Sequence, residues 1–283
     1  MLLIHIMEQT ELKYWVGLSS WKGLGWKKLE ILLKHFRSIK KIWEQGPQLN
    51  SLWQNTKNLN EEMENLHKRL IKVMTIADPD YPPLLKETAS PPLVLYILGS
   101  RELLSQSALA VVGTRRATGY GQRVTQRLVR ELAAKLVIVS GLARGIDTIA
   151  HRTALAGGGK TIAVLGHGLD QLYPPENRPL AEEIVAKGGA LVTEYPLRWP
   201  LDKTNFPLRN RIIAGLTLGT LVVEGGQKSG TKITANFAAD FNREVFCVPG
   251  QIDSPESDAT AELIKTGAKL ITKAEDIWEE FAL

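Results

Sequence analysis

Residues 113–121 combine glycines with two adjacent arginines directly before a predicted helix. Glycines let a main chain approach an anion closely, a helix N-terminus offers free N–H groups, and a guanidinium group pairs with two phosphate oxygens. We therefore expect Arg115 to contact phosphate, together with Gly113 and Thr114. Three more arginines share one face of the next helix and either extend this basic surface or form an ordinary solvated face: Arg123, Arg127 and Arg130.

A second basic segment, residues 203–215, adds an aromatic side chain. Cations for phosphates and an aromatic face for a base are the combination with which proteins hold single-stranded nucleic acid. The predicted contacts in this segment are Lys203, Phe206, Arg209, Asn210 and Arg211.

Structural roles would explain some of the same residues. Phe206 would also serve as a core anchor for the helix that follows it. Arg209 and Arg211 would also form internal ion pairs, for example with Glu194 or Glu224. The sequence leaves both alternatives open.

Two other glycine-rich loops follow predicted strands and are candidates for secondary phosphate contacts. The first, residues 140–147, contributes Ser140, Gly141 and Arg144, and the second, residues 224–231, contributes Lys228. In the first loop, Asp147 is expected to cap the next helix. His151 on that helix is expected to be a packed or capping residue rather than a catalytic base.

Motifs for cofactors, metals and catalysis are missing or incomplete. Residues 224–231 resemble a P-loop, but Thr231 stands where the lysine belongs, and residues 113–121 are not a dinucleotide fingerprint. Cys247 is the single cysteine, and the five histidines lack metal-ligand spacing. We therefore predict no cofactor, no metal and no catalytic centre.

The elements that must position these loops alternate along the chain from residue 93. Predicted strands are nearly continuous apolar runs, as in a sheet covered on both faces: residues 93–98, 108–112, 136–139, 161–165, 190–193, 220–223 and 244–248. Predicted helices lie near residues 120–134, 147–156, 177–187, 207–215, 231–242, 257–266 and 274–281. This alternation predicts an α/β fold with a doubly wound, mostly parallel sheet, in which ligands bind beyond the carboxyl ends of the strands.

Residues 1–75 differ from the rest and read as a small all-helical domain. Residues 76–92, rich in proline and aspartate, are expected to be a connector without regular structure, and residues 93–283 to form the α/β domain. The turn Gly23-Leu24-Gly25 before Lys27 and Lys28 is either a helix-hairpin-helix turn that holds a phosphate or a purely structural turn.

The single cysteine, Cys247, excludes a disulfide framework and fits a reducing, cytoplasmic setting. The net charge of +5 is weak evidence for a polyanionic partner. The start of the chain lacks a basic n-region, and no run of about 18 apolar residues occurs, so neither a signal peptide nor a membrane span is expected. Met7 is an alternative start to Met1.

Several sequence blocks, in order from residue 81 to residue 250, resemble the DprA/Smf family, the DNA-processing proteins of bacterial transformation. The matching blocks are residues 81–85, 111–115, 140–147 with Ala150 and His151, 173–177, 206–215, 229–235 and 243–250. The helical region resembles the SAM-like domain of that family. The resemblance implies an extended Rossmann-like fold and a homodimer. The C-terminal region, including Leu263, Ile264 and Leu270, is either a dimer face or ordinary core.

The resemblance also implies a function. It implies binding of single-stranded DNA without sequence preference, protection of that DNA, and loading of RecA recombinase onto it, with no enzymatic activity. It implies that Arg115 and Lys203 contact phosphate and that Phe206 stacks on a base. Many relatives carry a further winged-helix-like domain, for which we expect no room before Leu283.

Two other functions compete with this prediction. The lysine-decarboxylase-like group of nucleotide-processing enzymes resembles the α/β core, but its loop glutamate is missing from residues 225–234. A scaffold that only supports protein contacts would not need basic loops converging on one sheet edge. Neither alternative explains the loops as well as a DNA-binding site does.

Overall fold

The computed structural model describes residues 9–21, 23–49, 58–227 and 229–282. Nine strands form one sheet in the order β1-β2-β6-β5-β4-β3-β7-β8-β9. The pairs β1–β2 and β2–β6 are antiparallel, and every other neighbouring pair is parallel. Their bounds are β1 Ile71–Thr75, β2 Val94–Gly99, β3 Ala108–Val112, β4 Val137–Ser140, β5 Thr161–Val164, β6 Ala190–Thr193, β7 Gly219–Val222, β8 Glu244–Cys247 and β9 Lys269–Leu270.

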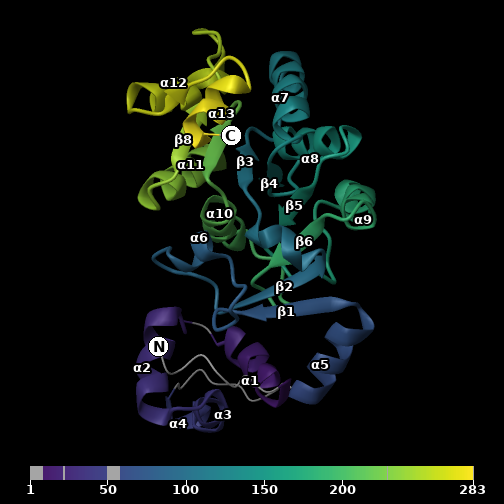
Figure 1. Ribbon diagram of the computed structural model, residues 1–283, viewed down its shortest axis with the longest axis vertical. Helices are drawn as coiled ribbons and strands as arrows, with labels where there is room; N and C mark the ends of the chain where they lie inside the picture. The colour runs from purple at the N-terminus through teal and green to yellow at the C-terminus, as the bar shows by residue number, and fades with distance from the viewer. Residues whose placement is uncertain (1–8, 22, 50–57, 228, 283) are drawn as a thin grey trace.

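The helices fall into an N-terminal group and a group around the sheet (Figure 1). The first group is α1 Gln9–Ser19, α2 Trp26–Phe36, α3 Ile39–Glu44, α4 Gly46–Leu49 and α5 Leu59–Lys68. The second is α6 Pro83–Lys86, α7 Gly119–Leu132, α8 Ile146–Ala156, α9 Arg178–Ala186, α10 Asn205–Gly215, α11 Gly230–Asp240, α12 Asp258–Lys265 and α13 Glu275–Phe281. Short 3-10 helices span Arg101–Ser105, Pro175–Asn177 and Pro255–Ser257. The predicted α/β class and the doubly wound, mostly parallel sheet are confirmed.

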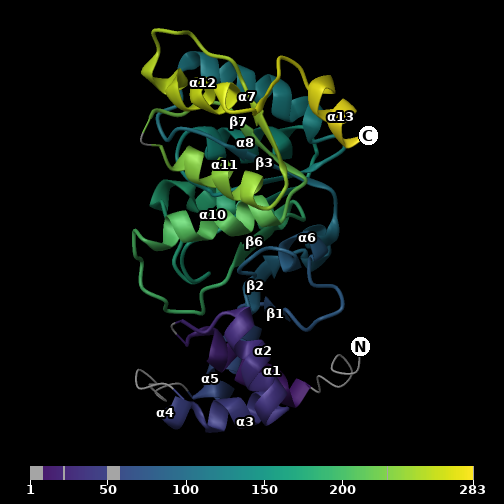
Figure 2. The same ribbon diagram turned by 90° about the vertical axis from the view of Figure 1, so that its left-hand side faces the viewer.

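The central strand β3 shows why its sequence is a continuous apolar run. Leu109 and Val111 belong to the core cluster that contains α7 and α8 residues, whereas Ala110 and Val112 belong to the cluster that contains α10 and α11 residues. Successive side chains of a strand point to opposite faces, so a sheet covered on both sides needs apolar residues at every position. Figure 2 shows α10 and α11 packed together in front of the sheet, with α7 behind it.

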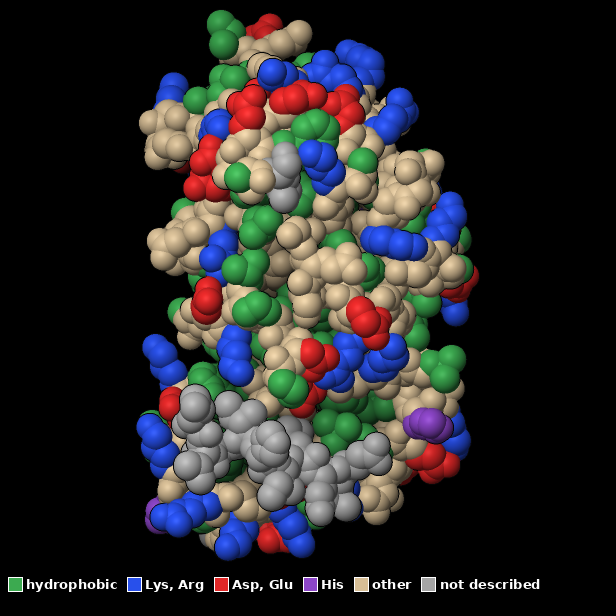
Figure 3. All heavy atoms as spheres, in the orientation of Figure 1, with side chains coloured by type: hydrophobic (Ala, Val, Ile, Leu, Met, Phe, Trp, Pro, Cys, Tyr) green, Lys and Arg blue, Asp and Glu red, His purple; other side chains and the backbone are tan. Residues whose placement is uncertain are grey.

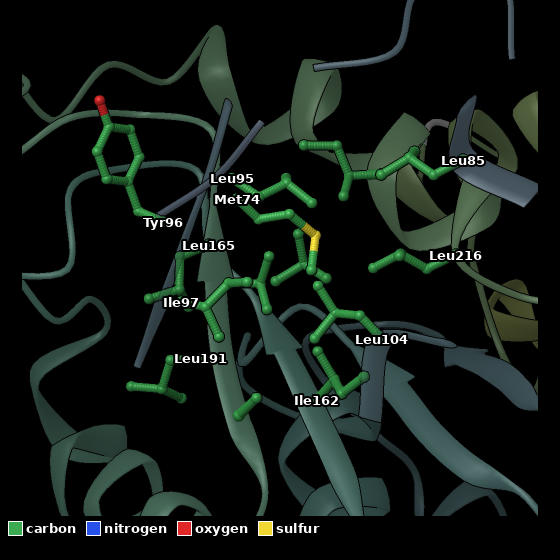
Figure 4. Packing of buried hydrophobic residues seen from close by; sticks show 14 of the residues in the cluster. Met74, Leu85, Leu95, Tyr96, Ile97, Leu104, Ile162, Leu165, Leu191 and Leu216 are labelled. Atoms are coloured by element: carbon green, nitrogen blue, oxygen red, sulfur yellow. The ribbon is translucent and has the colours of Figure 1, made fainter. Parts of the chain in front are cut away.

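The N-terminal helices join the core on the side of β1 and β2. Trp15 and Leu29 belong to the same buried cluster as Met74 of β1 and Tyr96 of β2. The hydroxyl of Tyr96 lies 2.8 Å from Oγ of Ser19 in α1. Figure 4 shows how Met74 and the β2 side chains lie among residues of β5, β6 and the 3-10 helix before β3. The N-terminal helices are thus anchored to the sheet by packing and not only by the chain.

The structure differs from the expected organisation in two places before β2. Residues 71–75, expected to end the helical region, form β1, which pairs with β2 from Ile71↔Leu98 to Thr75↔Val94. The five-residue strand lies at the sheet edge and has one partly exposed face, so it lacks the continuous apolar run by which the other strands were predicted. Residues 76–92 contain the one-turn helix α6 rather than being wholly irregular. The short edge strand β9 was also not predicted.

No helix within the described ranges is long and apolar enough to cross a membrane.

Candidate nucleic-acid interface

A cleft of about 500 Å³ opens at the carboxyl ends of the central strands. It lies where the strand order reverses, because β4, β5 and β6 extend to one side of β3 while β7, β8 and β9 extend to the other. Ligands of doubly wound folds bind at such a switch point. Six of the predicted contacts line this cleft: Gly113, Arg115, Lys203, Phe206, Arg209 and Asn210.

Two of the basic residues that line the cleft form no ion pair among the described residues. The side chains of Arg115 and Lys203 are exposed, and within the described part of the chain neither has a hydrogen-bond or ion-pair partner. They approach the cleft from different elements, since Arg115 follows β3 and Lys203 precedes α10. An anion in the cleft would therefore meet two positive charges that no carboxylate neutralises. A nucleic-acid backbone binds through such free cations.

Phe206 is half-buried and belongs to an aromatic group in the wall of the cleft. Its ring centroid lies 5.8 Å from that of Tyr173 and 6.4 Å from that of His167. A Cβ at Gly166 would lie 3.1 Å from the Phe206 ring, so the glycine lets the ring settle against the β5 end. Phe206 thus combines the predicted exposed face with the alternative role of an anchor. Tyr173, 38% exposed, also lines the cleft, and the sequence did not point to it because it lies in a proline-rich loop without cations.

Arg209 is buried, at 5% exposure, and its guanidinium group binds the main chain. Nη1 donates to the carbonyl oxygen of Gly141 at 2.8 Å and to that of Val164. Burial lowers the pKa of Arg209 to about 10. The side chain therefore joins the ends of β4 and β5 beneath the cleft, and this internal role accounts for its charge.

Arg211 does not line the cleft. Its Nη1 and Nη2 donate to the two carboxylate oxygens of Glu194 at 2.7 and 2.6 Å. The internal ion pair considered from the sequence is thus present with Glu194. Arg144 behaves similarly, because it pairs with Glu176 at the surface beside the cleft.

The amides of residues 140–147 hold a carboxylate of the protein itself. Gly141 N and Ala143 N donate to Oδ2 of Asp147 at 3.1 and 3.3 Å. Burial raises the pKa of Asp147, while neighbouring Arg209 and these donors oppose that shift. Ser140 is buried and donates to the carbonyl oxygen of Val111. The expected phosphate cradle is therefore occupied, and the expected N-cap role of Asp147 is wrong because Gly145 caps α8.

The N-terminus of α7 is also occupied, by Glu224 from the loop after β7. Thr118 donates to the Glu224 carboxylate through its main-chain N at 3.0 Å and through its hydroxyl. Thr114 N donates to the Glu224 carbonyl at 2.8 Å. A Cβ at Gly121 would lie 2.1 Å from Glu224 Oε2, so only glycine admits the carboxylate. The amides of Thr114 and Thr118 are therefore engaged by Glu224, whereas the Arg115 guanidinium of the same loop faces the cleft.

A family model described as DNA recombination-mediator protein A matches residues 72–282 of this chain. The chain belongs to that family. It is 41% identical to protein Smf of Synechocystis over 94% of this chain and 71% of that protein. It is 41% identical to the DNA processing protein DprA of Bacillus subtilis over 78% of this chain and 79% of that protein. The expected family is confirmed.

Solved structures of the family share the fold. The DNA processing protein A of Streptococcus pneumoniae superposes with a TM-score of 0.72 at 37% identity, over 86% of this chain and 92% of that chain. The protein from Helicobacter pylori, described for its unique single-stranded DNA binding mode, gives 0.67 at 32% identity, over 75% of this chain and 95% of that chain.

Predicted contacts therefore separate into three groups in this member of the recombination-mediator family. Arg115, Lys203 and Phe206 present free groups to the cleft, which Gly113 also lines, and Asn210 lies beside them with Nδ2 3.4 Å from the Gly230 carbonyl oxygen. Partners within the protein hold Thr114, Ser140, Gly141, Arg144, Arg209 and Arg211. Lys228 lies outside the described residues. No cluster of His, Cys, Asp or Glu among the described residues would hold a metal ion.

His151 is a packed residue, as the sequence indicated, and its imidazole ring is neutral in the folded protein. The side chain is fully buried in α8. The Thr161 hydroxyl donates to the Ile138 carbonyl, so it must accept from Nδ1–H of His151 at 2.7 Å. Nε2 is buried without a partner. Burial and the charge of Arg209 lower the pKa of His151 to about 3.

This burial predicts a loss of stability in mild acid. Below the ordinary pKa of 6.5, the unfolded chain binds a proton that the folded protein takes up only near pH 3. Between these values we expect the free energy of unfolding to fall by about 1.4 kcal/mol per pH unit through this residue. Urea unfolding at several pH values, compared with His151→Asn, isolates the effect, since asparagine keeps the donor but does not titrate. Parallel pH profiles for the two proteins would refute it.

Proposed function

We propose that this protein binds single-stranded DNA in the cleft, without sequence preference, and protects it. The observation that carries the proposal is the pair of unengaged cations, Arg115 and Lys203, beside the aromatic group of Phe206 and Tyr173. Cations bind phosphates of any sequence, and stacking on an aromatic ring tolerates every base. The binding of single-stranded DNA by the relative from Helicobacter pylori supports the same assignment.

The proposal contains no catalytic step. The buried carboxylate of Asp147 at the base of the cleft accepts from two loop amides and lies near Arg209, so these contacts give it a structural role. The rival function is nucleotide processing, since a cleft of about 500 Å³ also has the volume of a small-molecule site. Release of a base from nucleoside monophosphates by the purified protein would favour that rival.

Loading of RecA recombinase during natural transformation, assembly as a homodimer and a cytoplasmic location complete the proposal. Membership of the recombination-mediator family supports the first. For the dimer, Leu270 on the edge strand β9 is 47% exposed, and Leu263 and Ile264 of the neighbouring segment are only partly buried. We also propose that the N-terminal helices, which pack against β1 and β2, are a SAM-like region of the chain.

The test is the binding of oligo-dT by Arg115→Ala. Loss of a charge-assisted hydrogen bond costs about 1.5–3 kcal/mol, so we expect affinity to fall by about 10- to 150-fold. The plot of the logarithm of the binding constant against the logarithm of the salt concentration should become less steep by about 0.7. This is the contribution of one phosphate contact on a single strand. Fluorescence anisotropy over a salt series measures both.

Arg178→Ala is the matched control, because Arg178 is an exposed arginine of α9 that pairs with Glu182. It should leave affinity nearly unchanged. Wild-type affinity and slope in Arg115→Ala would remove the cleft as the site. Failure of the wild-type protein to shift oligo-dT at low salt would refute DNA binding and favour a protein scaffold.

A further inference from the structure

We propose that the outer face of α7 is a second part of the DNA path, on which a strand leaving the cleft continues past Arg116 to Arg123 and Arg130. The inference rests on the proposed function, because it assigns the direction in which the bound strand extends. The proposed ligand of this face is the sugar-phosphate backbone of single-stranded nucleic acid. The proposal is based on the position of the Arg115 loop directly before the start of α7.

Three arginines just before α7 and on its outer face have no ion-pair partner among the described residues. Arg116, Arg123 and Arg130 are exposed, and none has a side-chain partner within the described residues. Arg127, between the last two, differs because Nη2 donates to the Thr272 carbonyl at 2.6 Å and ties α7 to the segment before α13. The free arginines are therefore separable from the one that has a structural role.

Helix stability explains only Arg130, which lies in the last turn of α7, where the helix dipole favours a cation. Like charges three or four residues apart destabilise a helix, and Arg123, Arg127 and Arg130 stand at those spacings. The opposite face of α7 is secured by Leu128, Val129 and Leu132 in the core. The exposed face also carries Gln122 and Gln126, so it presents hydrogen-bond donors along most of its length.

The face is continuous with the cleft. α7 begins at Gly119, four residues after Arg115. Nη1 of Arg123 reaches back to 3.4 Å from the position of a Cβ on Gly119, so its guanidinium lies beside the loop. From Arg123 to Arg130 the helix advances about 10 Å. Figure 3 shows Lys and Arg side chains gathered at the upper right, where Figure 1 draws α7.

The test compares two lengths of oligo-dT on Arg123→Gln/Arg130→Gln. An oligomer of about 5 nucleotides fills the cleft, whereas one of about 16 nucleotides also reaches α7. We expect the short oligomer to bind with unchanged affinity. The long one should bind about 10- to 30-fold more weakly near 0.1 M salt, with a salt slope smaller by about 1.4, because two phosphate contacts are lost.

Arg178→Gln/Lys187→Gln is the control, since it removes the same charge from exposed positions at the start of α9 and just after its end. Circular dichroism checks the fold of the variant, so a binding loss with an unchanged spectrum is not a folding defect. Equal weakening of both oligomers, or an effect no larger than the control, would overturn the path along α7. Absence of wild-type binding would instead overturn the proposed function itself.

Discussion

Arg209→Met is expected to lower the free energy of unfolding by about 3–5 kcal/mol. The substitution keeps an apolar stem of similar length but removes the donors that bind the carbonyls of Gly141 and Val164. It also leaves the buried carboxylate of Asp147 without the cation that opposes its burial. Breaking one side of such a buried arrangement is costly, because the remaining polar groups can find neither water nor a partner.

Urea denaturation at neutral pH measures this change. Arg178→Met serves as the comparison, since exposed ion pairs contribute at most about 1 kcal/mol. A loss below about 1 kcal/mol in Arg209→Met would show that the carbonyls and Asp147 are satisfied without the guanidinium. Such a result would refute the structural role assigned to Arg209.

Phe206→Ala is expected to weaken binding of oligo-dT by about 5- to 150-fold, because a base stacked on an aromatic ring is worth about 1–3 kcal/mol. Phe206 offers one face to the cleft while it rests against Gly166 and Tyr173. Loss of the ring removes the stacking surface without removing a charge. The salt slope should therefore remain that of the wild-type protein, which separates this effect from that of Arg115→Ala.

Phe206→Tyr is the matched control, since it preserves the ring and should retain most of the affinity. Fluorescence anisotropy with oligo-dT at fixed salt compares the three proteins, and urea denaturation checks that each is folded. If alanine and tyrosine bind alike, Phe206 is an anchor of α10 and not a stacking surface.

The sequence predicted the fully buried strands of the sheet better than its partly exposed edge strands. The expected strands at β3 and β6 agree with the structure at both ends. Their residues are buried throughout, so their sequences are short apolar runs between helical segments. β1 and β9 were missed because they lie at the edges, where exposed residues interrupt the pattern. A local sequence pattern therefore identifies a strand that is buried on both faces, but it does not identify a strand that pairs at the edge of the sheet.

The sequence alone determined that cations, glycines and one aromatic residue would meet at the carboxyl edge of a parallel sheet, because strand–helix alternation places every such loop on that edge. Only the tertiary structure decided which of them remain free. Arg209 binds carbonyls 68 and 45 residues away, and the partner of Thr118 is Glu224, 106 residues away. A charge is neutralised by whatever the fold brings within about 3 Å of it, and local spacing does not contain that information. Arg115 and Lys203 keep their charges for a ligand because the fold brings no carboxylate of the described chain to them.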